Sequence, residues 1–157
     1  MSHCQATHLL IESIKTAQTF LTKDLSALSD EQLTKTYGGC TRTPLAILAE
    51  LSGGNLYGAA KIAGIETEIS PEDREAYRAQ FTSRDASMAL LTESTEKLLA
   101  AIHDLTEDHF NDKIEGPMGP MPKIGMAVLC LNHMMYHDGQ FNYIQTLEGD
   151  DKVHWMD

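Results

Sequence analysis

Apolar residues recur every three or four positions along the long stretches of this sequence, and that spacing restricts its fold more than any other feature. Such a spacing places the apolar side chains on one face of an α-helix, whereas a half-buried strand needs them at every second position. No stretch of the sequence shows that strict alternation. We therefore predict an all-α protein built as an antiparallel four-helix bundle.

Turn and capping residues suggest where the helices begin and end. We expect long helices over residues 6–28, 43–64, 83–103 and 123–147, and a short one over residues 71–79. Thr43-Pro44 and Ser70-Pro71 each combine a capping hydroxyl with a proline at the first helical position, where a missing N–H costs nothing. Closely spaced prolines and glycines in residues 116–122 predict an irregular apolar loop that could cover the mouth of a pocket.

Length and composition predict a single globular domain over residues 1–157. Of its 157 residues 42% are hydrophobic and 22% charged, which is enough for one buried core. A net charge of −11 argues against nucleic acid and against anionic membrane surfaces, because both attract clustered Lys and Arg. We find no apolar run long enough for a membrane span and no signal peptide. Three widely separated cysteines favour a reduced, cytoplasmic protein.

Two histidines in the last expected helix, His133 and His137, are spaced to bind one metal ion. Residues four apart on a helix lie about 40° apart around the axis and about 6 Å along it, so both imidazoles leave the same face. A pair with this spacing also arises by chance on the flank of a helix. The apolar residues that recur at helical spacing through this stretch are Ile124, Val128, Leu131, Met135 and Ile144.

A third metal ligand would have to come from another helix, and Glu50 is the strongest candidate. It lies beside Ile47 and Leu51, near the inward edge of an apolar stripe, where an unpaired carboxylate would be costly. Cys130 is a rival, since positions 130, 133 and 137 fall within about 60° of the helix circumference. Both residues have a plainer interpretation, Glu50 as a boundary residue exposed to water and Cys130 as a small buried hydrophobe.

The stretch LNHMMYHDGQFNYI, which contains both histidines, resembles the C-terminal signature of the DinB/YfiT-like superfamily of small four-helix proteins. In that superfamily a helix carries His-x-x-x-His followed closely by Gly-Gln. The resemblance extends to TPLAILAELSGGN, which is similar to the segment where such proteins carry another histidine. It implies an up-down-down-up bundle with a long crossover, often dimeric, and a divalent metal held by three histidines. His133 and His137 match two of these ligands, and Glu50 stands at the position of the third.

Two function classes remain open after this resemblance. Two histidines and a carboxylate are a chemically sound ligand set for zinc, nickel or iron. The resemblance implies a metal-dependent thiol transferase or isomerase, in which the metal activates a low-molecular-weight thiol toward a small-molecule substrate, with hydrolysis as the alternative chemistry. The replacement of the usual histidine by Glu50 is equally consistent with a site that has lost its metal. In that alternative the protein is a non-catalytic stress-response or binding module.

Three further residues are expected near such a site, and two predictions concern the surface. Asn55, Tyr136 and Gln140 are the expected substrate-orienting neighbours, while no residue is assigned a catalytic role.

The apolar loop around Met118 and Met121, together with the family resemblance, predicts a homodimer. The C-terminal Trp155 is expected to pack back on the domain.

Overall fold

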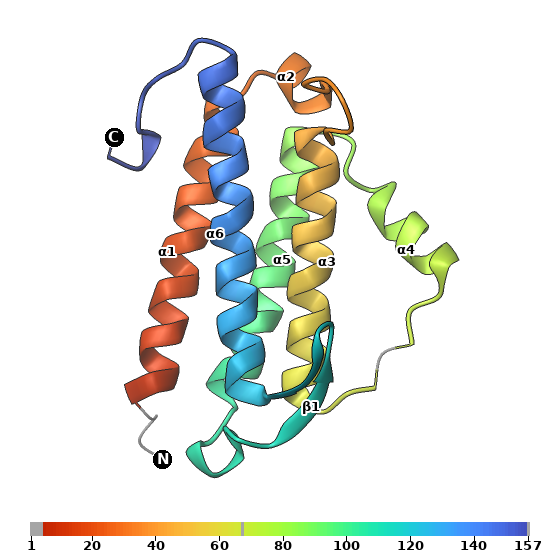
Figure 1. Cartoon of the computed structure of the whole chain (residues 1–157), viewed down its shortest axis with the longest axis vertical. Coiled ribbons are helices and arrows are strands. Elements are labelled where there is room, and N and C mark those ends of the chain that lie inside the picture. Colours follow the sequence, from red (N-terminus) through yellow and green to blue (C-terminus); the bar gives the residue numbers. More distant parts are fainter. Residues whose placement is uncertain (1–4, 67, 157) are drawn as a thin grey trace.

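The computed structural model describes residues 5–66 and 68–156, and in this part of the chain it confirms the helix bundle (Figure 1). The long helices are α1 (Gln5–Ala27), α3 (Pro44–Ala63), α5 (Arg84–His103) and α6 (Lys123–Leu147). Figure 1 shows α1 and α6 running in one direction and α3 and α5 in the other, which is the up-down-down-up order that the resemblance implies. Each long helix packs against two other long helices, in the order α1, α6, α3, α5 around the bundle.

The shorter elements lie in the connections and at the C-terminus. Helix α2 (Asp30–Thr34) joins α1 to α3, and the short 3-10 helices η1 (Glu107–His109) and η2 (His154–Met156) follow α5 and α6. Helix α4 (Pro71–Arg78) lies in the connection between α3 and α5. That connection must return along the bundle, because α3 and α5 run in the same direction (Figure 1).

Hydrogen bonds attach this long crossover to the bundle. The hydroxyl of Tyr77, on α4, lies 2.8 Å from the hydroxyl of Ser52 on α3. Ser52 in turn donates to the hydroxyl of Ser94 on α5, also at 2.8 Å. The ring of Tyr77 also meets Phe81 edge to face, with 5.4 Å between the centroids. Helix α4 is therefore held against the bundle at a defined place.

Capping residues begin the helices where the sequence predicts. The Thr43 side chain accepts a hydrogen bond from the Ala46 amide, with Pro44 as the first residue of α3. Ser70 caps α4 in the same way, and Gly64 ends α3 in the left-handed conformation at φ 74°. A side-chain cap of this kind stabilises a helix by about 1 kcal/mol.

Residues 113–122 correct one expectation, because they form a β-hairpin and not an irregular loop. Strand β1 (Lys113–Gly116) pairs antiparallel with β2 (Gly119–Pro122), so that Pro120 and Pro122 lie opposite Glu115 and Lys113. The two prolines are two positions apart, and their missing N–H groups therefore fall on the same edge of β2. A two-stranded hairpin leaves its outer edges unpaired, and prolines are tolerated there.

The buried face of α6 also differs from the expected one. Val128 and Met135, which belong to the apolar series at helical spacing, are 41% and 36% exposed. Leu9 of α1, although apolar, is 67% exposed. The residues of α6 that are buried are Met126, Ala127, Cys130, Met134, His137, Asp138, Phe141, Ile144 and Gln145. Apolar residues occur on most sides of α6, so their spacing alone does not select the face that packs.

The C-terminal segment returns to α1, as expected for Trp155. Its indole ring stacks on Phe20 with 4.4 Å between the centroids, and its Nε1 donates to the buried carboxylate of Asp24 at 2.7 Å. Asn142 and Gln145 of α6 donate to the same aspartate. Asp24 therefore joins α1, α6 and the C-terminal segment through one set of hydrogen bonds.

A second buried carboxyl, that of Asp138 on α6, lies beside Asp24. Burial, the hydrogen bond to Asp24 and the negative charge of Asp24 raise the pKa of Asp138 to about 8. Asp138 is therefore mostly protonated at neutral pH. Neither of its oxygens meets a hydrogen-bond donor in the described part of the chain, which agrees with a protonated carboxyl that faces the carboxylate of Asp24.

No described helix has both the length and the apolar character needed to cross a membrane.

Candidate metal centre

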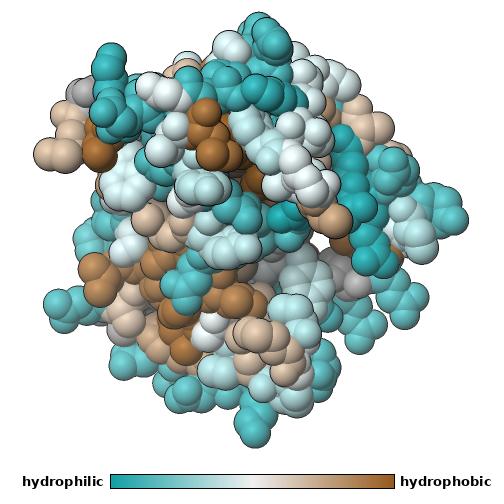
Figure 2. Space-filling model, turned by 45° about the horizontal axis from the view of Figure 1, so that its top comes forward, coloured by the Kyte–Doolittle hydropathy of each residue, from teal (hydrophilic) through white to brown (hydrophobic). Residues whose placement is uncertain are grey.

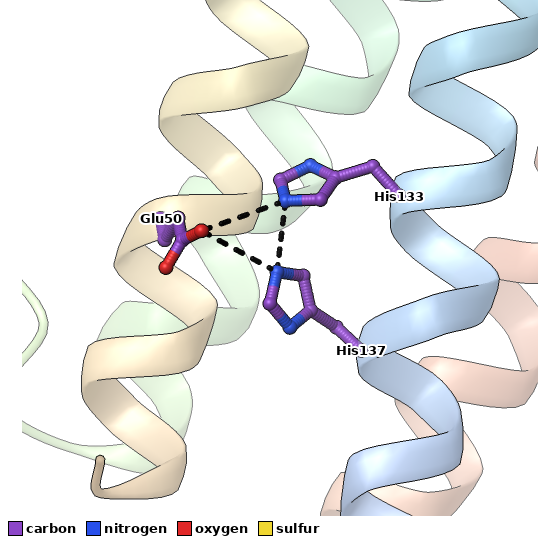
Figure 3. A group of neighbouring side chains, drawn as sticks. All are labelled: Glu50, His133 and His137. Carbon is purple, nitrogen blue, oxygen red and sulfur yellow. Dashed lines mark hydrogen bonds and ion pairs between the residues drawn. The ribbon is translucent and has the colours of Figure 1, made fainter. Parts of the chain in front are cut away.

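Glu50 of α3 and His133 and His137 of α6 point toward one another across the space between these helices (Figure 3). The Nε2 atoms of the two histidines are 2.8 Å apart. Oε1 of Glu50 lies 3.8 Å from Nε2 of His133 and 3.9 Å from Nε2 of His137. The structure thus brings together the three residues that the sequence names as ligands.

The spacing of these three atoms suits one metal ion. A tetrahedral ion with bonds of about 2.1 Å holds its ligand atoms about 3.4 Å apart. The separations of 2.8, 3.8 and 3.9 Å lie within roughly half an ångström of that distance, which small side-chain rotations can correct. Two imidazole nitrogens and one carboxylate oxygen also match zinc, nickel and iron in ligand type. The residues therefore fit a divalent metal.

The environment keeps both imidazoles neutral, which is the form that binds metals. Burial and the nearby charge of Arg42 lower the pKa of His133. Burial lowers the pKa of His137 to about 4, although the hydrogen bond with Gln140 acts to raise it. Gln140 Oε1 accepts that bond from Nδ1 of His137 at 2.7 Å, so the lone pair of His137 is on Nε2, the atom facing Glu50.

Arg42 is a part of the site that sequence reasoning missed. Its guanidinium forms an ion pair with Oε2 of Glu50, while Oε1 of the same carboxylate faces the histidines. One oxygen of Glu50 is thereby occupied and the other is left for a metal. Arg42 directly precedes the capping residue of α3, and nothing in the spacing of the sequence indicates that its side chain reaches Glu50.

Two glycines of α3 allow the site to form. A Cβ on Gly54 would lie 2.9 Å from Nδ1 of His133, and one on Gly58 would lie 2.3 Å from Sγ of Cys130. Both distances are shorter than a Cβ normally tolerates, so α6 can approach α3 this closely only because these positions lack a side chain. Packing therefore explains two of the three glycines that weaken the helix propensity of α3.

A cavity of about 1060 Å³ opens beside these residues, with Glu50 and His133 in its wall. Its volume is at the upper end of the range of small-molecule sites. Pro117, at the tip of the hairpin, reaches the cavity, as expected for a segment over a pocket mouth. The other lining residues are Gly53, Gly54, Tyr57, Glu68, Ile69, Arg74, Met126, Leu129, Cys130, Asn132 and Tyr136.

The three residues expected to orient a substrate lie in different parts of the structure. Tyr136 lines the cavity, with 63% of its surface exposed, and Gln140 lies behind His137. Asn55 is fully buried and donates to Thr95 of α5 at 3.2 Å, so its side chain serves the contact between α3 and α5. The structure does not bring Asn55 to the metal centre.

Cys130, the rival ligand, lies outside the group of three. It lines the cavity but is buried against Gly58. Burial raises the pKa of its thiol to about 12. A thiolate, and not a thiol, is the form that ligates metals, so the plainer interpretation of Cys130 as a buried hydrophobe agrees with its place in the fold.

The sequence matches the DinB superfamily over residues 13–141. The chain belongs to the DinB superfamily. No curated protein sequence matches it significantly.

Solved structures of low sequence identity share the fold. YfiT from Bacillus subtilis, described as a probable metal-dependent hydrolase with an unusual four-helix bundle topology, is 18% identical, with a TM-score of 0.70 over 94% of this chain and 91% of that one. A conserved protein from Enterococcus faecalis is 13% identical, with a TM-score of 0.75 over 92% and 97% of the two chains. A mycothiol-dependent maleylpyruvate isomerase is 17% identical, with a TM-score of 0.68 over 85% of this chain but only 59% of the isomerase.

Proposed function

We propose that this DinB-like protein is a metal-dependent enzyme that activates a low-molecular-weight thiol and acts, as a transferase or isomerase, on a small molecule. The observation that carries the proposal is the convergence of Glu50, His133 and His137, with Glu50 and His133 in the wall of a large cavity. The fold shared with a mycothiol-dependent isomerase and a protein described as metal-dependent supports it. In this proposal the three residues are the ligands of zinc, nickel or iron.

Each residue of the site has a part in this chemistry. A divalent ion with three protein ligands would lower the pKa of a thiol or water in its open position and so supply a nucleophile at neutral pH. Glu50 provides the negative charge that two neutral imidazoles lack. Gln140 holds His137 with its Nε2 toward the site, and Tyr136 offers a hydroxyl to a substrate in the cavity. The apolar part of the cavity wall would keep water from the nucleophile.

Turnover assays test this proposal. Protein loaded with zinc or nickel is incubated with chlorodinitrobenzene and with cysteine, glutathione or mycothiol as the thiol. We expect the loaded wild type to accelerate formation of the thioether, and chelator-stripped protein and His133→Ala to lose that acceleration. Equal rates for loaded and stripped protein would contradict the proposal. Cleavage of a nitrophenyl ester without any reaction of the thiols would favour the hydrolytic alternative.

One observation favours the second candidate, a non-catalytic binding module. The two histidines are hydrogen-bonded to each other, and the carboxylate of Glu50 is paired with Arg42, so each group has a protein partner without a metal. In that case the purified protein would take up no stoichiometric zinc or nickel. A metal titration therefore separates the two candidates.

We further propose that the protein is a cytoplasmic homodimer without nucleic-acid or membrane partners. Its charge of −11 and the unpaired state of Cys40 and Cys130 support this setting. Met118 at the hairpin tip is 78% exposed, and Leu9 and Met135 are exposed on the neighbouring helices α1 and α6. Figure 2 shows that apolar side chains gather on one part of the face it displays and are not spread evenly over it.

A further inference from the structure

We propose that the cavity beside the metal centre binds a small molecule with an apolar body and a single carboxylate, and that Arg74 binds this carboxylate. The inference rests on the proposed function, because it names the substrate class of the same site. Arg74 lies on α4, so the crossover, and not one of the four long helices, would supply the group that recognises the substrate.

Arg74 has hydrogen-bonding capacity to spare. A guanidinium carries five N–H donors. Among the described residues, its side chain donates one hydrogen bond, from Nη2 to the carbonyl of Ile69 at 3.2 Å. No described carboxylate forms an ion pair with Arg74, and its neighbour Asp73 accepts instead from the hydroxyl of Ser70 at 2.8 Å. The remaining donors are free to bind a carboxylate in the forked geometry that arginine favours.

The side chain of Arg74 is exposed, and two contacts of the crossover anchor it before a ligand binds. Tyr77 lies one helical turn further along α4, and its hydroxyl is 2.8 Å from that of Ser52 on α3. The bond to Ile69 holds the guanidinium on the other side. A charged group that is already in place loses less conformational entropy when it binds its ligand, which raises the affinity.

The cavity wall suits an apolar body and allows the acid only one orientation. Ile69, Met126 and Leu129 contribute apolar surface to the cavity wall that also contains His133 and Arg74. Among the described side chains that line the cavity, Arg74 alone is a lysine or arginine. Glu50 and Glu68 line it as well, so a carboxylate is attracted at Arg74 and repelled at these two positions. In a protein of net charge −11, this local arrangement selects a monoacid.

Calorimetric binding of two matched thiols tests the inference. Zinc-loaded protein is titrated with ω-mercaptooctanoate and with ω-mercaptooctanol, which differ only in the carboxylate. We expect the wild type to bind the acid about tenfold more tightly or better, since a charge-assisted hydrogen-bonded pair has that effect. Arg74→Ala should remove this preference and Arg74→Lys should keep part of it. Arg78→Ala, on the same exposed helix but outside the cavity lining, is the matched control and should keep all of it.

A second comparison needs no metal. Chelator-stripped protein is titrated with octanoate and octanol, and the same preference for the acid, dependent on Arg74, is expected. Equal binding of acid and alcohol by the wild type, or a preference that survives Arg74→Ala, overturns the inference and leaves the proposed function standing. If the zinc-loaded protein binds neither thiol, the proposed function fails, and the octanoate comparison alone then decides for or against Arg74.

Discussion

At the level of single residues, Glu50, His133 and His137 each depend on a neighbouring residue that sets the position or the free atoms of the side chain. Arg42 takes one oxygen of Glu50, Gln140 fixes the tautomer of His137, and Gly54 leaves room for His133. A metal site of this kind depends on such supporting contacts as much as on the ligands themselves. Two predictions follow from them.

Gln140→Ala should lower zinc affinity about 10- to 100-fold, because removal of an orienting partner of a metal-binding histidine has that effect. His137 would be free to rotate or to place its proton on Nε2. Gln140→Glu should retain binding, since a carboxylate accepts the same hydrogen bond from Nδ1. Competition with a chromophoric chelator measures the affinities, and an unchanged affinity for Gln140→Ala would show that this contact does not support a ligand.

Gly54→Ala should weaken zinc binding with little loss of fold, because its Cβ would press on the His133 imidazole. The neighbouring Gly53 provides the control, since a Cβ there meets no atom within 4 Å. Gly53→Ala should keep the metal affinity and stabilise α3 by up to about 1 kcal/mol. Thermal unfolding and zinc titration of both variants check this pair, and equal zinc affinities for both would be the contrary result.

The sequence predicted which three side chains meet between α3 and α6 better than it predicted their surroundings. The spacing of His133 and His137 fixes their common face once a helix is assumed, and Glu50 stands where the superfamily carries its third ligand. The ion pair of Arg42 could not be predicted, because it depends on how the loop before α3 folds back. Asn55 looked equally accessible in the sequence, but the rotation of α3 turns it toward α5.

At the level of elements, the helices were predictable and the faces of α6 were not. Capping residues such as Thr43 and Ser70 act locally, so the bounds of α3 and α4 follow from the sequence. The buried face of α6 depends on which neighbours it meets, and an apolar surface on most sides leaves that choice to tertiary packing. The hairpin was missed for a related reason, since the two prolines of β2 are acceptable only because the edge they occupy is unpaired.

The contact between α1 and α6 leads to a prediction about pH. The pKa of Asp138 is raised to about 8 in the folded protein from the ordinary value of 3.8, so folding favours the protonated carboxyl. Its stabilising contribution is complete below the ordinary pKa and is lost as the pH rises through the folded pKa. Between about pH 6.5 and about pH 8.5, the free energy of unfolding should fall by about 2 kcal/mol from this group.

Asp138→Asn should remove that pH dependence, because an amide donates to Asp24 at any pH. Urea unfolding of both proteins in this range, with a chelator present, measures the difference. The pKa values of His133 and His137 are lowered in the folded protein, so their partial protonation in the unfolded state near pH 6.5 acts in the opposite direction. This contribution is the same in both proteins, and the comparison between them removes it. Parallel pH profiles for the two proteins would mean that Asp138 is ionised in the fold.

At the level of the whole molecule, we predict a dimer in solution. Exposed apolar side chains such as Met118, Leu9 and Met135 are costly to leave in water, and a second copy would cover those that it contacts. Light scattering at micromolar concentration should report twice the chain mass of 17.4 kDa. A monomer at that concentration would contradict the prediction, and Met118→Ser and Met135→Ser would then be expected to change nothing.

The central claim is that Glu50, His133 and His137 hold one divalent metal between α3 and α6. Titration of chelator-stripped protein with zinc and nickel tests it most directly, using wild type, Glu50→Ala, Glu50→His and His133→Ala. We predict stoichiometric binding by the wild type, a loss of affinity in Glu50→Ala about as severe as in His133→Ala, and retained binding in Glu50→His. No stoichiometric uptake by the wild type, or equal affinity for wild type and Glu50→Ala, would contradict the claim.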